Sequence, residues 1–256
     1  MPGSAVSQVS IVIPAYNEAA RLPRSLAVLA EYLRGWGQRP YEVLVMVEES
    51  TDGTLELAKE TVREQVNFHI IDNGPQRGKG HAVRSGMLQA RGDIVFYMDA
   101  DLSVPVEEIA EFLAFFDAHP ELDVLLGSRQ HPQSRIERRQ GWLRQTMGKT
   151  FNRILRMLVV LPYRDTQCGF KAFRKGAARE IFSRQQIDGF AFDVEVLLLA
   201  REMGYAVAEL PVRWLNSPES KVHIVGDSLK MLRDAMMVRS RISFTKGNTG
   251  GAGDGA

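Results

Sequence analysis

Short apolar runs alternate with helical stripes through the first half of the chain. The apolar runs predict strands, and the stripes predict the helices that join them. We expect strands at residues 9–13, 41–47, 68–71, 94–98 and 124–126, and helices within residues 22–33, 55–62, 78–90 and 106–116. Ser50, Thr51 and Asp52 offer an N-cap for the second helix. Because strand and helix alternate, the pattern predicts an α/β fold with a parallel sheet and right-handed crossovers.

The second half of the chain has a less regular pattern. Pro211 interrupts an apolar run over residues 206–215, which favours a strand at the edge of a sheet. The tail, residues 247–256, is almost entirely small residues and is predicted to be disordered, as is the N-terminus, residues 1–8. The remaining elements expected here are an amphipathic helix or helix pair over residues 142–161, a short strand at 170–173, and helices at 194–203 and 226–241.

Composition narrows the class of protein. The chain has 256 residues, of which 45% are hydrophobic and 25% are charged, so it can bury a substantial core. Cys168 is the only cysteine, so no internal disulfide can form. The longest apolar runs are far shorter than the roughly 18 residues that a spanning helix needs, and the N-terminus does not resemble a signal peptide. These features predict a cytoplasmic protein.

Positive charge is concentrated in one segment. The chain carries a net charge of +1, yet residues 129–156 contain eight basic residues and one acidic residue. This block predicts an anionic partner.

The clearest candidate chemistry is Asp99-Ala100-Asp101, directly after the buried strand at 94–98. Side chains two residues apart in extended backbone point the same way, and ligands of parallel sheets bind at the carboxyl ends of the strands. Two carboxylates at that edge can share Mg²⁺ or Mn²⁺ with phosphate oxygens. The alternative is a solvated acidic turn.

Two further segments follow predicted strands. Residues 14–18, Pro-Ala-Tyr-Asn-Glu, would line the same crevice, although an ordinary turn capped by Asn17 is an alternative. Residues 77–80, Arg-Gly-Lys-Gly, let the backbone approach a phosphate while Lys79 supplies charge, but the spacing is not that of a P-loop.

Taken together, these segments resemble the family 2 glycosyltransferases of the GT-A fold. Gly127-Ser128-Arg129, the stretch from Asp165 to Lys171, Phe192-Asp193-Val194-Glu195 and Ser220-Lys221-Val222 are similar to the dolichyl-phosphate β-glucosyltransferase branch. The resemblance extends over residues 9–241. It implies one GT-A domain, a Rossmann-like, mostly parallel sheet flanked by helices, with a nucleotide-sugar half at 9–129 and an irregular acceptor half at 130–241.

The resemblance also implies roles for individual residues. Asp99 and Asp101 would bind the metal, and Asp101 and Arg129 would serve catalysis. If the acceptor were a hydroxyl, a base would be needed, and Asp193 or Glu195 would be the candidates. The nucleotide sugar would be bound by Pro14, Tyr16, Glu18, Glu48, Glu49, Lys79, Asp99 and Ala100. The acceptor would be bound by Arg129, Arg135, Arg138, Arg139 and Lys221.

One loop departs from the family pattern. The family usually carries Val-Asp-Asp-Gly-Ser-x-Asp-Gly-Thr after the second strand, and this chain has a stretch one residue shorter with Glu48 and Glu49 in place of the aspartates. Either glutamate can accept a hydrogen bond from uracil, so which one reads the base stays open.

The resulting prediction is a metal-dependent, inverting transfer of a hexose, expected to be glucose from UDP-glucose, to polyprenyl or dolichyl phosphate. Residues 142–161 have an apolar stripe and a basic face, which suits peripheral contact with a membrane, although a helix facing the core has the same pattern. No contact with nucleic acid is expected. The rivals are a glycosyltransferase that acts on a hydroxyl and a non-catalytic module that binds sugar nucleotides.

Overall fold

The computed structural model describes residues 7–137, 161–215, 233–234 and 236–238. The strands are β1 (Val9–Ala15), β2 (Tyr41–Val47), β3 (Phe68–Asp72), β4 (Ile94–Met98), β5 (Val124–Ser128), β6 (Arg135–Ile136), β7 (Phe170–Arg174), β8 (Val207–Pro211) and β9 (Arg213–Trp214). The helices are α1 (Leu22–Arg34), α2 (Thr54–Thr61), α3 (Lys79–Gln89), α4 (Glu108–Ala118), α6 (Lys175–Arg184) and α7 (Phe192–Glu202).

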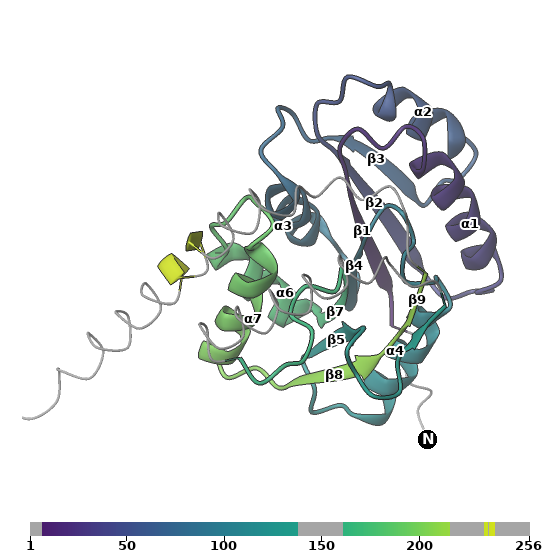
Figure 1. Ribbon diagram of the computed structural model, residues 1–256. Helices are drawn as coiled ribbons and strands as arrows, with labels where there is room; N and C mark the ends of the chain where they lie inside the picture. The colour runs from purple at the N-terminus through teal and green to yellow at the C-terminus, as the bar shows by residue number, and fades with distance from the viewer. Residues whose placement is uncertain (1–6, 138–160, 216–232, 235, 239–256) are drawn as a thin grey trace, which may run out of the picture.

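Seven strands form one sheet in the order β3-β2-β1-β4-β7-β5-β8, and β6 pairs with β9 beside it (Figure 1). The pairs within β1–β4 are parallel, as the alternation of strand and helix predicts. The exception is β7, which enters antiparallel between β4 and β5. The sheet is therefore mostly parallel, which confirms the predicted fold class.

Helices cover both faces of the sheet. Alternate side chains of β1 and β4 point to opposite faces. Ile11 and Phe96 pack in one buried cluster with α1, α2 and α4, while Val12 and Tyr97 pack in a second cluster with α3, α6 and α7 (Figure 1). Each central strand is thus buried on both faces, which explains its continuous apolar sequence.

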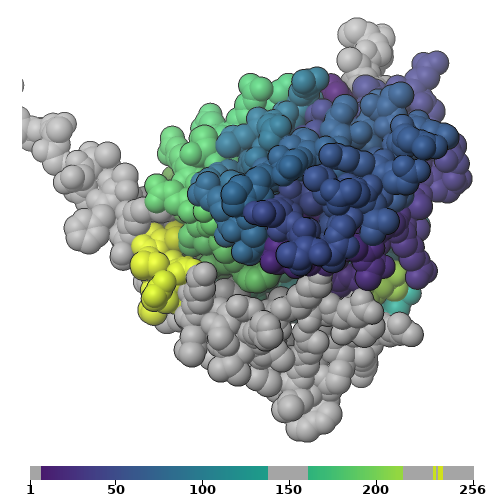
Figure 2. All heavy atoms as spheres, turned by 90° about the horizontal axis from the view of Figure 1, so that it is seen from above, coloured from purple at the N-terminus to yellow at the C-terminus, as the bar shows by residue number. Residues whose placement is uncertain are grey.

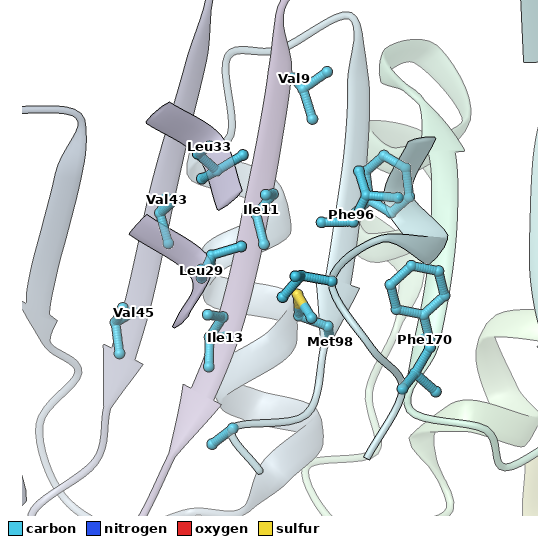
Figure 3. Close-up of a cluster of buried hydrophobic side chains, with 14 of the residues drawn as sticks. Val9, Ile11, Ile13, Leu29, Leu33, Val43, Val45, Phe96, Met98 and Phe170 are labelled. Atoms are coloured by element: carbon cyan, nitrogen blue, oxygen red, sulfur yellow. The ribbon is translucent and has the colours of Figure 1, made fainter. Parts of the chain in front are cut away.

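Aromatic packing joins the late strand β7 to the first half of the chain. Phe170 lies 4.8 Å from Phe112 of α4 in an edge-to-face arrangement and 5.7 Å from Phe96 of β4, measured between ring centroids. Figure 3 shows Phe96 and Phe170 near each other in this cluster. Each such pair contributes about 0.5–1.5 kcal/mol beyond its buried area.

In Figure 2, α6 and α7, in green, adjoin the blue surface of the first half, and residues of α6 and α7 pack in the same buried cluster as residues of β1, β2 and α3.

Two boundary expectations change in the structure. The N-cap of α2 is Gly53, whose φ of +80° suits glycine, rather than a residue of 50–52. The Asp52 carboxylate accepts a hydrogen bond from the N–H of Thr54, the first residue of the helix. The predicted strand at 206–215 is divided into β8 and β9, and β8 lies at the sheet edge as Pro211 predicts.

Several other expectations fall outside the described residues. The tail lies outside them, and so does the predicted helix over residues 142–161 apart from Leu161. Of the predicted helix at 226–241, only residues 233–234 and 236–238 are described, and these are helical. No helix among the described residues has the length and apolar character needed to cross a membrane.

We expect two helical glycines to respond in opposite ways to substitution by alanine. At Gly86 in α3, a Cβ atom would lie 2.4 Å from Val12 and 2.9 Å from Met46, so Gly86→Ala should destabilise the fold by about 1–3 kcal/mol. At Gly176 in α6 nothing lies within 4 Å, so Gly176→Ala should be neutral or stabilising by up to about 1 kcal/mol. Urea unfolding measures both changes, and equal effects would contradict the close packing of α3 on the sheet.

Candidate active site

The loops that follow β1, β2 and β4 meet at one edge of the sheet because parallel strands end there together. Asn17 joins the first two loops. Its backbone N–H donates to Ser50 Oγ at 3.0 Å, and its side-chain oxygen accepts from the Thr51 N–H at 2.9 Å. Its φ of +52° is a left-handed conformation that asparagine tolerates. Asn17 therefore bridges two loops and does not cap α1, which begins after Arg21.

Asp99 and Asp101 stand at the end of β4, as predicted. The Asp99 carboxylate is 38% exposed and lies 2.6 Å from Lys79 Nζ. The Asp101 carboxylate is 19% exposed, accepts the Ser103 N–H at 3.0 Å, and lies 3.5 Å from the Arg21 guanidinium. Each carboxylate thus faces a cation from another loop.

The proximity of Lys79 to Asp99 follows from the position of α3. Gly80 at the start of this helix packs so closely on Ile187 and Phe192 that no side chain would fit there. Burial opposes the charged form of Lys79, but Asp99 and, to a lesser degree, Asp193 outweigh it and raise its pKa to about 12. Lys79 is therefore cationic at neutral pH, as a role beside phosphate requires.

Arg21 is a site residue that the sequence analysis missed. Its Nε donates to Glu18 at 2.8 Å, and its Nη1 reaches Asp101. The spacing of three residues to Glu18 was visible in the sequence, but the contact with Asp101 depends on the placement of β1 beside β4. Arg21 thus connects a residue predicted to bind nucleotide with a residue predicted to bind metal.

Glu48 and Glu49 have different environments. The Glu48 side chain is 1% exposed, and its carboxylate accepts the Gly78 N–H at 3.0 Å and lies 3.0 Å from His81 Nδ1. Glu49 is exposed. Glu48 therefore holds the loop before α3 against the end of β2, while Glu49 faces solvent.

Three other residues predicted to bind the nucleotide lie near the carboxyl ends of β1 and β4. Pro14 is buried within β1 opposite Met46, Ala100 is 7% exposed, and Tyr16 is 40% exposed. Pro14 and Ala100 therefore shape the backbone at this edge, and Tyr16 offers a ring to solvent.

Arg129, whose side chain is 32% exposed, forms a two-pronged ion pair with the buried Asp165. Its Nε and Nη2 lie 2.7 and 2.9 Å from the two oxygens of Asp165, and its backbone N–H also donates to Asp165. Burial opposes both charges, yet the pairing raises the pKa of Arg129 and lowers the pKa of Asp165. The guanidinium carbon lies 5.8 Å from the Trp214 ring. Arg129 keeps its charge but has two of its nitrogens engaged.

Asp193, named above as a base in case the acceptor is a hydroxyl, is held by buried partners in this structure. Asp193 is 4% exposed and its Oδ1 accepts hydrogen bonds from Lys171 and Tyr97. The nearby Glu195 is fully buried and accepts the backbone N–H groups of Gln186 and Ile187. Both carboxylates are thus occupied by hydrogen-bond donors inside the core.

The predicted acceptor residues are described only in part. Arg135 lies exposed in β6, which pairs with β9. Arg138, Arg139 and Lys221 lie outside the described residues.

The donor set at Asp99 and Asp101 suits a hard divalent cation. Within the described ranges, no three histidine, cysteine, aspartate or glutamate side chains gather into a group that could enclose a metal. Mg²⁺ is typically bound by one or two carboxylates together with substrate phosphates, which matches a pair at an open sheet edge. Gly169 leaves room for the Asp99 carboxylate, because a Cβ there would lie 2.0 Å from Asp99 Oδ2.

Comparisons with known proteins agree with this arrangement. The sequence profile described as "Glycosyl transferase family 2" matches residues 10–182. The chain is 34% identical over 244 residues to the dolichyl-phosphate beta-glucosyltransferase of Drosophila melanogaster, covering 90% of this chain and 74% of the relative. It is 32% identical over 248 residues to the human protein of that name, covering 93% and 76%.

Solved structures show the same fold. Glucosyl-3-phosphoglycerate synthase from Mycobacterium tuberculosis in complex with UDP is similar with a TM-score of 0.64 at 18% identity, covering 95% of this chain and 86% of that one. A complex of that enzyme with Mn²⁺, UDP and phosphoglyceric acid gives a TM-score of 0.60 at 17% identity, covering 92% and 78%. On the sequence match, the sheet order and the placement of Asp99 and Asp101, the chain belongs to glycosyl transferase family 2 and is a glycosyltransferase with the GT-A fold.

Proposed function

We propose that this enzyme transfers glucose from UDP-glucose to dolichyl or polyprenyl phosphate, with inversion at the anomeric carbon. The names of the relatives at 30–34% identity support the sugar and the acceptor. The choice of a phosphate acceptor rests on one observation: Asp193 and Glu195, the candidate bases, are both engaged in buried hydrogen bonds. A hydroxyl must lose a proton to a base as it attacks, whereas a phosphate oxygen is already an anion.

The residues at the sheet edge have defined tasks in this reaction. An oxygen of the acceptor phosphate attacks C1 of glucose while the bond from C1 to the diphosphate oxygen breaks, and UDP leaves. Asp99 and Asp101 would hold Mg²⁺ or Mn²⁺, which supplies positive charge to the departing diphosphate. Lys79 and Arg21, each beside one of these carboxylates, add charge at the same place.

Nucleotide recognition is proposed for the loops after β1 and β2. Tyr16 and Glu49 have exposed side chains there, so we assign contact with the base or ribose to Glu49 rather than to Glu48. Glu48 contributes indirectly, since it holds Gly78 and thereby the start of α3. A structure with bound UDP tests the assignment, and a Glu49 carboxylate directed away from both base and ribose would contradict it.

The acceptor lipid is proposed to approach from the basic segment. Arg129 and Arg135 belong to this segment, as do Arg138, Arg139 and Lys221, and residues 142–161 would rest on the membrane. A peripheral enzyme on the cytoplasmic face of a membrane is the corresponding location.

Neutralising Asp101 should remove most activity while the fold persists. Asp101→Asn should lower kcat/KM for UDP-glucose by at least about 100-fold, because one hard ligand and its charge are lost beside the leaving group. Product glycolipid is measured with polyprenyl phosphate and Mn²⁺, and circular dichroism checks the fold. Asp117→Asn on the exposed side of α4 is the matched control and should behave as the parent enzyme. Full turnover in EDTA would refute the metal requirement.

Charge reversal in the basic segment should weaken membrane binding. A surface cation near an anionic bilayer contributes about 1 kcal/mol, so the loss of two weakens binding to phosphatidylserine vesicles about 30-fold, and reversal to two anions weakens it by at least that much. The variant combines Arg138→Glu with Arg139→Glu. The matched control combines Lys59→Glu with Arg91→Glu, which reverses two exposed charges outside the basic segment. Binding is measured by vesicle sedimentation at several salt concentrations. Equal losses in both variants, or faster glycosylation of a soluble alcohol than of polyprenyl phosphate, would contradict the proposed acceptor surface.

A further inference from the structure

An ion pair is buried directly beneath the candidate metal ligands. Lys171 of β7 is 0% exposed, and its ammonium contacts Asp193 Oδ1 of α7. The same ammonium donates a hydrogen bond to the backbone oxygen of Cys168 at 2.7 Å, and the Tyr97 hydroxyl also donates to Asp193. Every partner in this network lies within the described core.

Core stability alone does not account for such a pair. Removing two charges from water is costly, and replacing a buried pair with apolar residues is often neutral or stabilising. The surroundings here are apolar, since the Tyr97 ring packs against Phe173, Phe182 and Phe192. Buried polar groups that are fully satisfied fix a unique local geometry, which directs attention to the backbone that Lys171 holds.

The backbone held by Lys171 forms one wall around Asp99. The Asp99 N–H donates to Gly169 O at 3.0 Å, next to the paired residues Met98 and Phe170. A Cβ on Gly169 would lie 2.0 Å from Asp99 Oδ2 and 2.3 Å from its Cγ. The position of the Cys168–Gly169 turn therefore limits where the Asp99 carboxylate can point.

We propose that Lys171 and Asp193 are positioning residues that fix the Asp99 carboxylate for metal binding, acting through the Cys168–Gly169 turn. The proposal rests on the proposed role of Asp99 as a metal ligand. The chain of contacts runs from Asp193 to Lys171, from Lys171 to the Cys168 carbonyl, and from Gly169 to Asp99.

The other end of this segment is also anchored. Asp165 binds Arg129, and its backbone N–H donates to Glu209 at 2.8 Å. Residues 165–171 are thus held by an ion pair at each end, so release of the Lys171 end should let the turn shift next to Asp99.

The single cysteine gives an independent measure of the turn. Cys168 is 1% exposed, and burial raises the pKa of its thiol to about 12, so in the folded protein it should react very slowly with iodoacetamide at pH 8. Since the chain has no other cysteine, alkylation reports the exposure of Cys168 alone.

The experiment compares two double variants of the full chain. Lys171→Met with Asp193→Asn removes both charges and keeps a hydrogen-bond acceptor for Tyr97. The control, Ser10→Ala with Glu42→Gln, alters a buried pair whose Ser10 Oγ and Glu42 Oε1 lie 2.6 Å apart near the start of β1, at the opposite edge of the same sheet. Free Mn²⁺ is measured by electron paramagnetic resonance with UDP present, and Cys168 alkylation is followed in parallel.

The Lys171–Asp193 variant should bind Mn²⁺ about 10- to 100-fold more weakly, as supporting residues of metal sites do when they are changed. Its Cys168 should be alkylated at least about 10-fold faster, because local opening becomes easier. The control should match the parent protein in both measurements. If Asp193 were instead a catalytic base, kcat would fall while Mn²⁺ affinity stayed unchanged, and that result would overturn the proposal.

A second variant keeps the test decisive if the double variant does not fold. Gly169→Ala retains the ion pair but places a methyl group against Asp99, and it should also weaken Mn²⁺ binding at least about 10-fold. Gly189→Ala, where nothing lies within 4 Å, is its control. Unchanged Mn²⁺ affinity in Gly169→Ala would overturn this inference and leave the proposed function standing. Failure of the parent protein to bind Mn²⁺ with UDP would refute the proposed function itself.

Discussion

The backbone of Gly169 lies directly against the Asp99 carboxylate, and this contact constrains much of the site. It requires β7 to run antiparallel beside β4, with Phe170 opposite Met98, so that the turn before β7 arrives at the carboxyl end of β4. It also requires a residue without a side chain at position 169. A chain segment far along the sequence thus becomes one wall around a candidate metal ligand, and aromatic packing of Phe170 on Phe96 and Phe112 keeps it there.

Charge at this edge is organised in pairs. Lys79 faces Asp99 and Arg21 faces Asp101, while Arg129 and Lys171 are paired with Asp165 and Asp193. Asp99 and Asp101 of the first two pairs are partly exposed, whereas Asp165 and Asp193 are buried, and the Lys171–Asp193 pair is buried on both sides. Asp99 and Asp101 are therefore accessible to an arriving ligand, whereas Asp165 accepts the Arg129 N–H and Lys171 holds the Cys168 carbonyl, so the other two pairs hold backbone in place.

The state of Asp193 links structure to the choice of acceptor. A carboxylate that serves as a base must meet the acceptor proton, and Asp193 instead meets a lysine and a tyrosine inside the core. An acceptor that already carries negative charge removes the need for a base. The concentration of basic residues at 129–156 of the sequence is consistent with such an acceptor.

The sequence by itself determined the alternation of strands and helices, the edge position of β8, and the placement of Asp99 and Asp101 at the end of a buried strand. These features follow from periodicity and from residues adjacent in the chain, which local physics controls. Tertiary structure alone decided the antiparallel entry of β7, the contact of Arg21 with Asp101, the burial of Glu48 and the pairing of Asp193 with Lys171. Each of these joins residues from elements that become neighbours only when the sheet order is set, because a short apolar strand carries no local mark of its direction or its partner.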